Sequence, residues 1–357
     1  MRDTARRAFV ASLVVGAVLV LALALWKLRI LIALVFLAFI VAAAMRPGVD
    51  ALRRRHVPRA IGIAVHYLGL AAFVALLLAL VVPVAVDQVQ EAIDRLPTSG
   101  RDLRERAETA TGFEHELLVG LQRALEDLPR PRELVDPALE LTFLGFEIAL
   151  GIFFTLASAA YWIYERDRAV ALVTALVPPH RRRVVRDTWT LIDLKLGAYV
   201  RGQMLLVVLV GTVLSALFWA IGLPLWLLVG VFAGVVELIP VIGPLTAGAL
   251  AVGIGLSESL AVAAAAGLIV LVVRLIEDYL VIPRVLGEAV GLSPLLVLFS
   301  VAAVAILFGE FTVLLAIPIA AVVATLIDVV VLNKNPAEQE VPTVLFPAQD
   351  AETVGRG

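Results

Sequence analysis

The sequence predicts an all-α fold: a polytopic membrane helix bundle of about eight hydrophobic segments, two of them broken, plus a small extracytoplasmic helical insertion. Three observations lead to this prediction. The 357-residue chain is 61% hydrophobic and 17% charged, with a mean hydropathy of +1.00. Apolar runs of about 18 residues or more recur along it, which is enough to cross a bilayer as a helix. Two of these runs are interrupted by proline or glycine, which frees backbone groups that lipid cannot satisfy.

The composition also excludes several classes of function. A net charge of −2 gives no general attraction to nucleic acid, and the absence of cysteine removes disulfides, thiol chemistry and cysteine-based metal sites. Sequence motifs of metalloproteases, serine hydrolases and nucleotide-binding loops are missing. We therefore expect no enzyme, no catalytic residues, no cofactor and no metal. The expected partners are the lipid bilayer and a small-molecule or ion substrate.

Residues 1–86 are expected to form the N-terminal transmembrane helices. A basic start precedes apolar runs at 8–26 and 30–45, which we interpret as an uncleaved, tight pair of helices. Five arginines lie in the next segment, 46–59, and a short basic loop of this kind is typical of the cytoplasmic side. The third span contains His66, which we expect to be a packed structural residue, with a proton-carrying role as the alternative.

The next two segments differ in charge. Residues 87–140 are rich in acidic side chains and contain leucines at helical spacing around 113–128, which predicts an extracytoplasmic amphipathic helical insertion. Residues 141–202 are expected to contain a span followed by a basic amphipathic linker in the cytoplasm.

Residues 203–332 form the expected transport core, with broken segments at 222–256 and 291–332. Paired, interrupted hydrophobic segments in two parts of one chain indicate the binding site of a transporter. Freed amides can hold anionic or hydroxyl oxygens, freed carbonyls can hold cations, and a nearby acid can bind a cation or proton. The candidate substrate- or ion-binding residues are Glu237, Pro240, Gly243, Pro244, Gly309 and Glu310.

A charged cluster lies in the apolar run 260–282. Arg274 is three residues before Glu277 and four before Asp278, so the three side chains share one helix face. Such charges are costly in a membrane unless they pair or face water. We interpret them as a coupling element or latch, and paired structural residues are the alternative.

Two topologies fit the charge pattern. Each broken segment either crosses the membrane once as a kinked helix or enters and leaves as a re-entrant hairpin. The likeness between the two segments favours hairpins. The arms at 224–239 and 245–256 are long enough to reach the midplane at about 1.5 Å per residue. Both arrangements place the polar residues 333–357 in the cytoplasm as a flexible tail.

Several motifs of the C-terminal half resemble the autoinducer-2 exporter-like (AI-2E) family of bacterial permeases. They cover about residues 140–332 and occur in the family's order; the N-terminal spans agree in hydropathy only. The matching pieces are GAYVRGQ (197–203), GLP (222–224), ELIPVIGP (237–244), EDYLVIPRVLG (277–287) and GLSPLLVL (291–298). A departure is FGEF at 308–311, where similar proteins tend to have a glycine-rich, uncharged break.

The resemblance implies a multi-pass protein of the bacterial inner membrane and a homo-oligomer, with a pentamer as the implied size. It also implies transport of small solutes, which is autoinducer-2 export in some members and sodium or lithium/proton antiport in others. We therefore expect a carrier with an elevator-like alternating-access mechanism and cytoplasmic N- and C-termini. The alternatives are a Na⁺(Li⁺)/H⁺ antiporter, a channel, and a non-transporting membrane scaffold.

Overall fold

The apolar runs of this chain form helices, which satisfy backbone polar groups within one segment as hydrocarbon requires. The computed structural model describes residues 2–95, 135–239, 242–285, 293–339 and 341. Every element within these ranges is helical, so the all-α prediction is confirmed. The longer helices are α1 (Arg2–Lys27), α2 (Arg29–Arg54), α3 (Arg59–Arg95), α6 (Val135–Ala175), α7 (Arg182–Ala220), α8 (Trp226–Val236), α9 (Ile242–Glu258), α10 (Leu260–Ile276), α12 (Pro294–Phe308) and α13 (Ala316–Val330). The short elements are η1 (Pro179–Arg181), η2 (Glu277–Val281), α11 (Ile282–Val285), η3 (Glu310–Leu315) and η4 (Pro336–Glu338).

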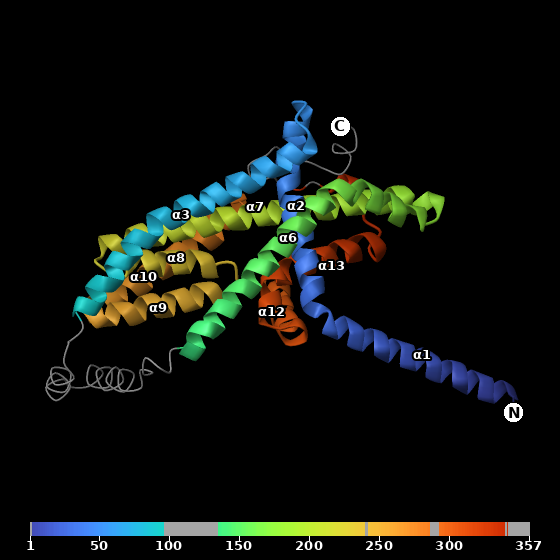
Figure 1. Cartoon of the computed structure of the whole chain (residues 1–357), viewed down its shortest axis with the longest axis horizontal. Helices are drawn as coiled ribbons and strands as arrows, with labels where there is room; N and C mark the ends of the chain where they lie inside the picture. Colours follow the sequence, from blue (N-terminus) through green and yellow to red (C-terminus); the bar gives the residue numbers. More distant parts are fainter. Residues whose placement is uncertain (1, 96–134, 240–241, 286–292, 340, 342–357) are drawn as a thin grey trace.

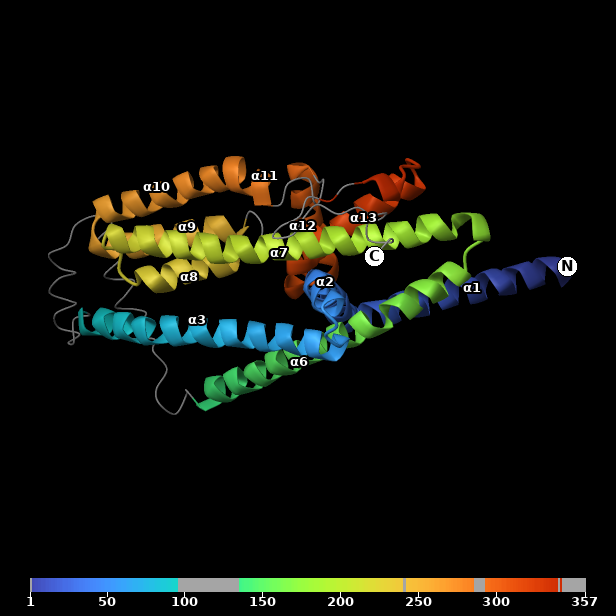
Figure 2. The same cartoon turned by 90° about the horizontal axis from the view of Figure 1, so that it is seen from above.

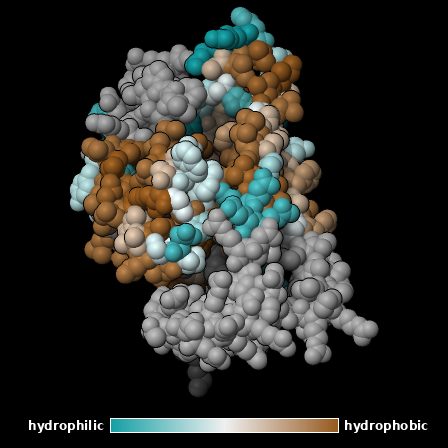
Figure 3. Space-filling view, turned by 90° about the vertical axis from the view of Figure 1, so that its left-hand side faces the viewer, coloured by the Kyte–Doolittle hydropathy of each residue, from teal (hydrophilic) through white to brown (hydrophobic). Residues whose placement is uncertain are grey.

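Seven helices in the described part of the chain are long and apolar enough to cross a membrane. The apolar helices α8, α9 and α12 are shorter. Large apolar side chains face outward along these helices, and Figure 3 shows hydrophobic surface over much of one side of the molecule. An outer surface of this kind suits lipid rather than water. The prediction of a polytopic membrane bundle is therefore confirmed.

The first two helices differ from the tight pair expected for 8–26 and 30–45. A break at Leu28 separates α1 from α2, and α1 projects away from the bundle (Figure 1). The described side chains of α1 are exposed throughout. In lipid, apolar surface alone does not drive helices together, so adjacency in sequence does not ensure packing.

Helix α7 combines two segments that the sequence analysis separated. The basic amphipathic linker and the apolar run that begins at Met204 form one unbroken helix from Arg182 to Ala220. Its N-terminal half packs against α2 and α13, where Leu196 is buried, and its C-terminal half packs against α8, where Phe218 is buried. Helix α7 therefore contacts α8 and α10 at one end and α13 at the other. The predicted insertion at 87–140 lies mostly outside the described residues.

Helices α7 to α10 run alongside one another (Figures 1 and 2). Small residues allow the close packing, since Cβ atoms added at Gly230 and Gly234 would lie 2.6 Å or less from backbone or side-chain atoms of α7. At the α9–α10 contact, a Cβ on Gly255 would lie 2.7 Å from the Cα of Ala263. Close approach through small residues is the usual way for helices to associate in lipid.

The chain turns back on itself between α8 and α9. Ala233 and Val229 of α8 share one apolar core with Ala247 and Ala251 of α9, so the two helices are antiparallel neighbours. At the tip, a Cβ on Gly243 would lie 2.0 Å from the carbonyl oxygen of Val236. Only glycine fits this approach.

A second turn joins α12 to α13. Helix α12 ends at Gly309, whose φ of 96° favours glycine, and the 3₁₀ segment η3 leads into α13. The hydroxyl group of Thr312 donates a hydrogen bond of 2.6 Å to the carbonyl oxygen of Gly309. Helices α12 and α13 also contact each other directly. In the first segment α8 is followed by a turn and α9, and in the second α12 is followed by η3 and α13.

The start of the expected flexible tail packs against α7. After Asn333, which has a φ of 52°, the chain turns back and places Val341 in a cluster with Leu191 and Ala198. The ammonium group of Lys195 donates hydrogen bonds to Gln339 at 3.3 Å and to Thr325 of α13 at 3.2 Å. We call the described residues 333–339 and 341 the C-terminal strap. Residues 342–357 lie outside the described residues.

Replacement of Val341 by aspartate is expected to release the strap from α7. Val341 is 1% exposed, and its burial contributes about 1.5–3 kcal/mol, which a charged side chain would forfeit. We expect faster proteolysis of the tail and a lower melting temperature, while the helices stay assembled. Limited proteolysis and thermal unfolding of the purified protein measure both effects.

Glu338→Ala is the matched control, because Glu338 lies on the exposed side of the same strap. Equal proteolysis of the two variants and the wild type would contradict the packing of the strap.

Candidate functional site

The two turns of the C-terminal region meet in the folded chain. Ile239, at the tip between α8 and α9, packs against an apolar cluster formed by α12, η3 and α13. The buried members of this cluster are Val301, Val304, Val313 and Ala316. We call this contact the hairpin junction. It brings together two segments that are about 60 residues apart in the sequence.

A charged cluster begins at Glu237, two residues before Ile239 of the hairpin junction. One guanidinium nitrogen of Arg274, Nη1, lies 2.9 Å from Glu237 Oε1 and 3.3 Å from Glu277 Oε2. The other nitrogen, Nη2, lies 2.9 Å from Asp278 Oδ1. We call these four residues the arginine–carboxyl cluster. It links the tip of the first hairpin to the end of α10.

Three members of this cluster are close together in the sequence and therefore lie on neighbouring turns of one helix. Arg274 is in the last turn of α10, and Glu277 and Asp278 begin the π-helical turn η2 that continues it. Turns of this kind in α-helices are often found at functional sites. Glu237 joins from outside the helix, and its contact with Arg274 is a long-range contact that spacing does not reveal.

The three carboxyl groups of the cluster differ in how exposed they are. Glu237 and Glu277 are 6% and 3% exposed, whereas the side chain of Asp278 is 41% exposed. Asp278 therefore reaches the surface of the chain, whereas the two glutamates are enclosed by protein. The Oε1 atom of Glu277 is buried and has no hydrogen-bond partner.

Gln203 is a member of the site that the search for charged residues missed. It is buried in α7, and its amide nitrogen donates a hydrogen bond of 2.9 Å to the backbone carbonyl oxygen of Glu237. Helix α8 ends just before Glu237, so this carbonyl has no continuing helix to satisfy it. Gln203 thus holds the tip in place. Its position in the GAYVRGQ motif was the available signal.

Two other residues of that motif fix the crossing of α7 and α2. A Cβ at Gly197 would lie 2.6 Å from the carbonyl oxygen of Ala43, so only glycine permits this approach. Pro47 lacks the amide hydrogen that normally bonds this carbonyl within the helix. Arg201 donates a hydrogen bond of 3.2 Å to the neighbouring carbonyl oxygen of Ala44.

The site residues predicted from the sequence lie in several different elements. Gly243 and Pro244 lie in the first turn of α9, and Gly309 ends α12. Pro240 is outside the described residues, as is the side chain of Glu310, whose backbone begins η3. His66 is packed against Gly48, and its Nδ1 atom lies 2.7 Å from the carbonyl oxygen of Gly62.

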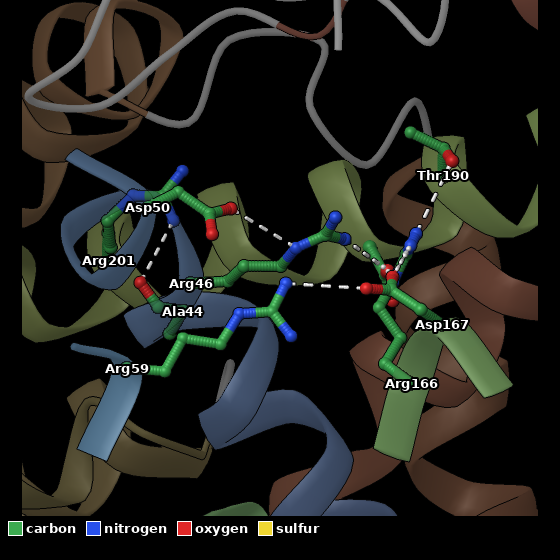
Figure 4. Close-up of polar contacts among 9 residues, drawn as sticks. Ala44, Arg46, Asp50, Arg59, Arg166, Asp167, Thr190 and Arg201 are labelled. Carbon is green, nitrogen blue, oxygen red and sulfur yellow. Dashed lines mark hydrogen bonds and ion pairs between the residues drawn. The ribbon is translucent and has the colours of Figure 1, made fainter. Parts of the chain in front are cut away.

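A second polar cluster joins α2, α3, α6 and α7, and its residues precede those of the arginine–carboxyl cluster in the sequence (Figure 4). Asp193 of α7 is 5% exposed, and its Oδ2 atom accepts from Arg166 at 2.6 Å and from Arg46 at 3.0 Å. Arg59 at the start of α3 pairs with Asp167 at 3.3 Å. Removal of either arginine would weaken the pairing of the buried Asp193, so these ion pairs hold α2, α6 and α7 in register. The Arg59–Asp167 pair that reaches α3 is a surface pair, since the side chain of Asp167 is 63% exposed. Its residues are too far apart in sequence to be recognised from spacing.

The chemistry available at the candidate site is that of three carboxyl groups and one guanidinium group. No group of three or more His, Cys, Asp or Glu side chains suited to a metal ion occurs among the residues that the structure describes. The arginine–carboxyl cluster adjoins the apolar hairpin junction. Such an arrangement of groups can form ion pairs and can bind a proton.

Comparison with known proteins gives a consistent result. The model of a family described as AI-2E family transporter matches residues 15–332. Two candidate transport proteins of Bacillus subtilis (strain 168) are similar: YrrI is 23% identical over 285 residues, 77% of this chain and 80% of YrrI, and YueF is 24% identical over 283 residues, 76% and 77%. A candidate transport protein of Mycobacterium tuberculosis (strain CDC 1551 / Oshkosh), MT0215, is 28% identical over 354 residues, covering 94% of this chain and 92% of MT0215.

Proposed function

This chain belongs to the AI-2E family of transporters, and from that premise we propose that it moves a small polar solute or signalling molecule across the bacterial inner membrane. In this proposal residues 203–332 are the transport core, and each broken segment is a re-entrant hairpin. Both termini lie in the cytoplasm, as the basic segments 46–59 and 165–201 indicate. A homo-oligomer, expected to be a pentamer, completes the proposed assembly.

The observation that carries this proposal is the hairpin junction. Ile239 links the first turn to the apolar cluster of the second, and the arginine–carboxyl cluster lies beside it. A solute bound between the two turns would contact side chains and backbone from both. Separation of the turns on one side and then the other would give alternating access, with the core moving in an elevator-like way.

The junction can be tested because the chain contains no cysteine. Ile239→Cys combined with Val304→Cys places two thiols at the hairpin junction. We expect oxidation or a short crosslinker to stop solute flux in proteoliposomes, because the turns can no longer separate, and reduction to restore it. Uptake of candidate solutes under imposed sodium and proton gradients identifies the flux to be measured.

The control pair, Ala233→Cys with Ala247→Cys, joins α8 to α9 within the first hairpin. Its crosslinking should leave flux unchanged. Full flux with the 239–304 crosslink formed would refute the proposal that the junction opens. Counterflow of unlabelled solute separates a carrier, which shows it, from a channel.

A Na⁺(Li⁺)/H⁺ antiporter is the second candidate function. It is favoured by the two buried glutamates at one guanidinium group, since transported cations and protons need carboxyl groups of this kind. Sodium-driven proton movement in proteoliposomes without any added solute would support this candidate.

A further inference from the structure

Two buried carboxyl groups share one guanidinium nitrogen. Glu237 Oε1 and Glu277 Oε2 both contact Nη1 of Arg274, so the two carboxyl groups lie side by side at one nitrogen. Asp278 contacts the other guanidinium nitrogen, and its side chain is partly exposed. Among the residues that the structure describes, Arg274 is the only cation in ion-pair contact with either glutamate.

The charges of this cluster do not balance when every group is ionised. Three carboxylates then face one guanidinium group, and two of the carboxylates are almost fully buried. Gln203 does not relieve this imbalance, because it donates to the backbone carbonyl of Glu237 rather than to the carboxylate. The Oε1 atom of Glu277 is left buried with no donor at all. An uncompensated buried carboxylate costs several kcal/mol, so neutralisation is strongly favoured.

We propose that Glu237 and Glu277 hold a single exchangeable proton between them and that its release loosens the hairpin junction. The proton forms an O–H bond on one carboxyl group, which donates to the other, and it leaves to water as the pair opens. The second part of this inference rests on the proposed function, in which the junction separates during transport.

Loss of the proton can affect the hairpin junction directly, because Glu237 is two residues from Ile239. Without the proton, both glutamates carry a negative charge, and one guanidinium nitrogen no longer offsets their repulsion. Glu237 is at the tip of the first hairpin, whereas Glu277 is at the end of α10, so repulsion pushes the tip away from α10. Ile239 is two residues further along and moves with the tip, which weakens its contact with the second hairpin.

Infrared spectroscopy tests the proton site without any substrate. The purified wild-type protein should show the C=O stretch of one protonated carboxyl group at neutral pH, shifted in D₂O and lost as the pH rises. Glu277→Gln and Glu237→Gln should each abolish this band, whereas Asp278→Asn, which changes the exposed member, should retain it. A wild-type protein without the band, or a band that survives both glutamine variants, overturns the proposal.

Thiol accessibility tests the link to the junction. With Ile239→Cys as the only cysteine, we expect labelling by a charged methanethiosulfonate reagent to accelerate several-fold as the pH rises through the loss of the infrared band. The rate is divided by that of Leu176→Cys, an 87% exposed position, which removes the pH dependence of thiol chemistry itself. The ratio should stay constant with pH in Glu277→Gln and rise in Asp278→Asn.

The same rise in the Glu277→Gln background would overturn the link between the proton and the junction. These outcomes are independent of solute flux. A protein that transports no solute tested would therefore contradict the proposed function while leaving the proton site intact.

Discussion

Replacement of Arg274 by glutamine is expected to abolish transport and to lower stability more than any other single substitution in the candidate site. The guanidinium group makes three ion pairs, and its loss leaves two buried glutamates without a cation. Breaking a buried ion pair by removing one partner costs about 3–5 kcal/mol. The side chain of Arg274 is 27% exposed, so we expect the lower end of that range. Even this value is a large part of the stability of a typical protein, about 5–15 kcal/mol.

Thermal unfolding in detergent and flux in proteoliposomes measure the two effects separately. The double variant R274Q/E277Q should recover part of the lost stability, because it removes one of the unpaired carboxylates. It should remain inactive, because the remaining glutamate has neither its cation nor its carboxyl partner. A stable R274Q protein with normal flux would show that the arginine–carboxyl cluster is not required.

Arg168→Gln is the matched control for the loss of an arginine. Arg168 is 80% exposed and pairs with Glu165, which is also exposed. Surface ion pairs of this kind contribute only about 0–1 kcal/mol. We expect its melting temperature and flux to stay close to those of the wild type.

The fold class could be predicted because the signals for it lie within short stretches of the sequence. Apolar runs mark helices through their length, and proline and glycine mark the places where helices end. The same local spacing placed Arg274, Glu277 and Asp278 on one face. These predictions did not depend on how the helices pack together.

The contacts that the sequence analysis missed are all long-range. Glu237 reaches Arg274 across α9 and most of α10, and Gln203 reaches Glu237 from α7. Asp193 meets Arg46 across 147 positions. No periodicity relates such residues, so spacing could not pair them. The strap was expected to be flexible because 333–357 is polar as a whole, but the few apolar residues near its start are enough to hold it.

The packing of α8 on α7 explains why these helices lie side by side. Gly230 contacts Ser215, and Gly234 contacts Gly211 and Val207 one turn further along. Contacts between backbones replace the side-chain layers of a soluble core. The first hairpin is consequently attached to α7 along its first arm, and its tip is held to α7 by the hydrogen bond from Gln203.

Gly230→Ala is therefore expected to prevent α8 from docking on α7. The added Cβ would lie 2.1 Å from Ser215 Oγ and 2.6 Å from the backbone nitrogen and Cα of the same residue. A hydroxyl group can rotate away, but backbone atoms cannot, so the helices must move apart. Overpacking of this kind typically costs about 1–3 kcal/mol, and a backbone clash should reach or exceed the upper end. We expect a large loss of monodisperse protein in gel filtration and a lower melting temperature.

Gly253→Ala provides the comparison that separates packing from helix propensity. Gly253 lies in α9, is exposed, and has no atom within 4 Å of an added Cβ. Alanine is a better helix former than glycine by about 1 kcal/mol, so this variant should be as stable as the wild type or more stable. Opposite shifts in melting temperature for the same chemical change would locate the effect in the α7–α8 contact. Equal shifts would mean that the two helices are not packed as closely as their glycines allow.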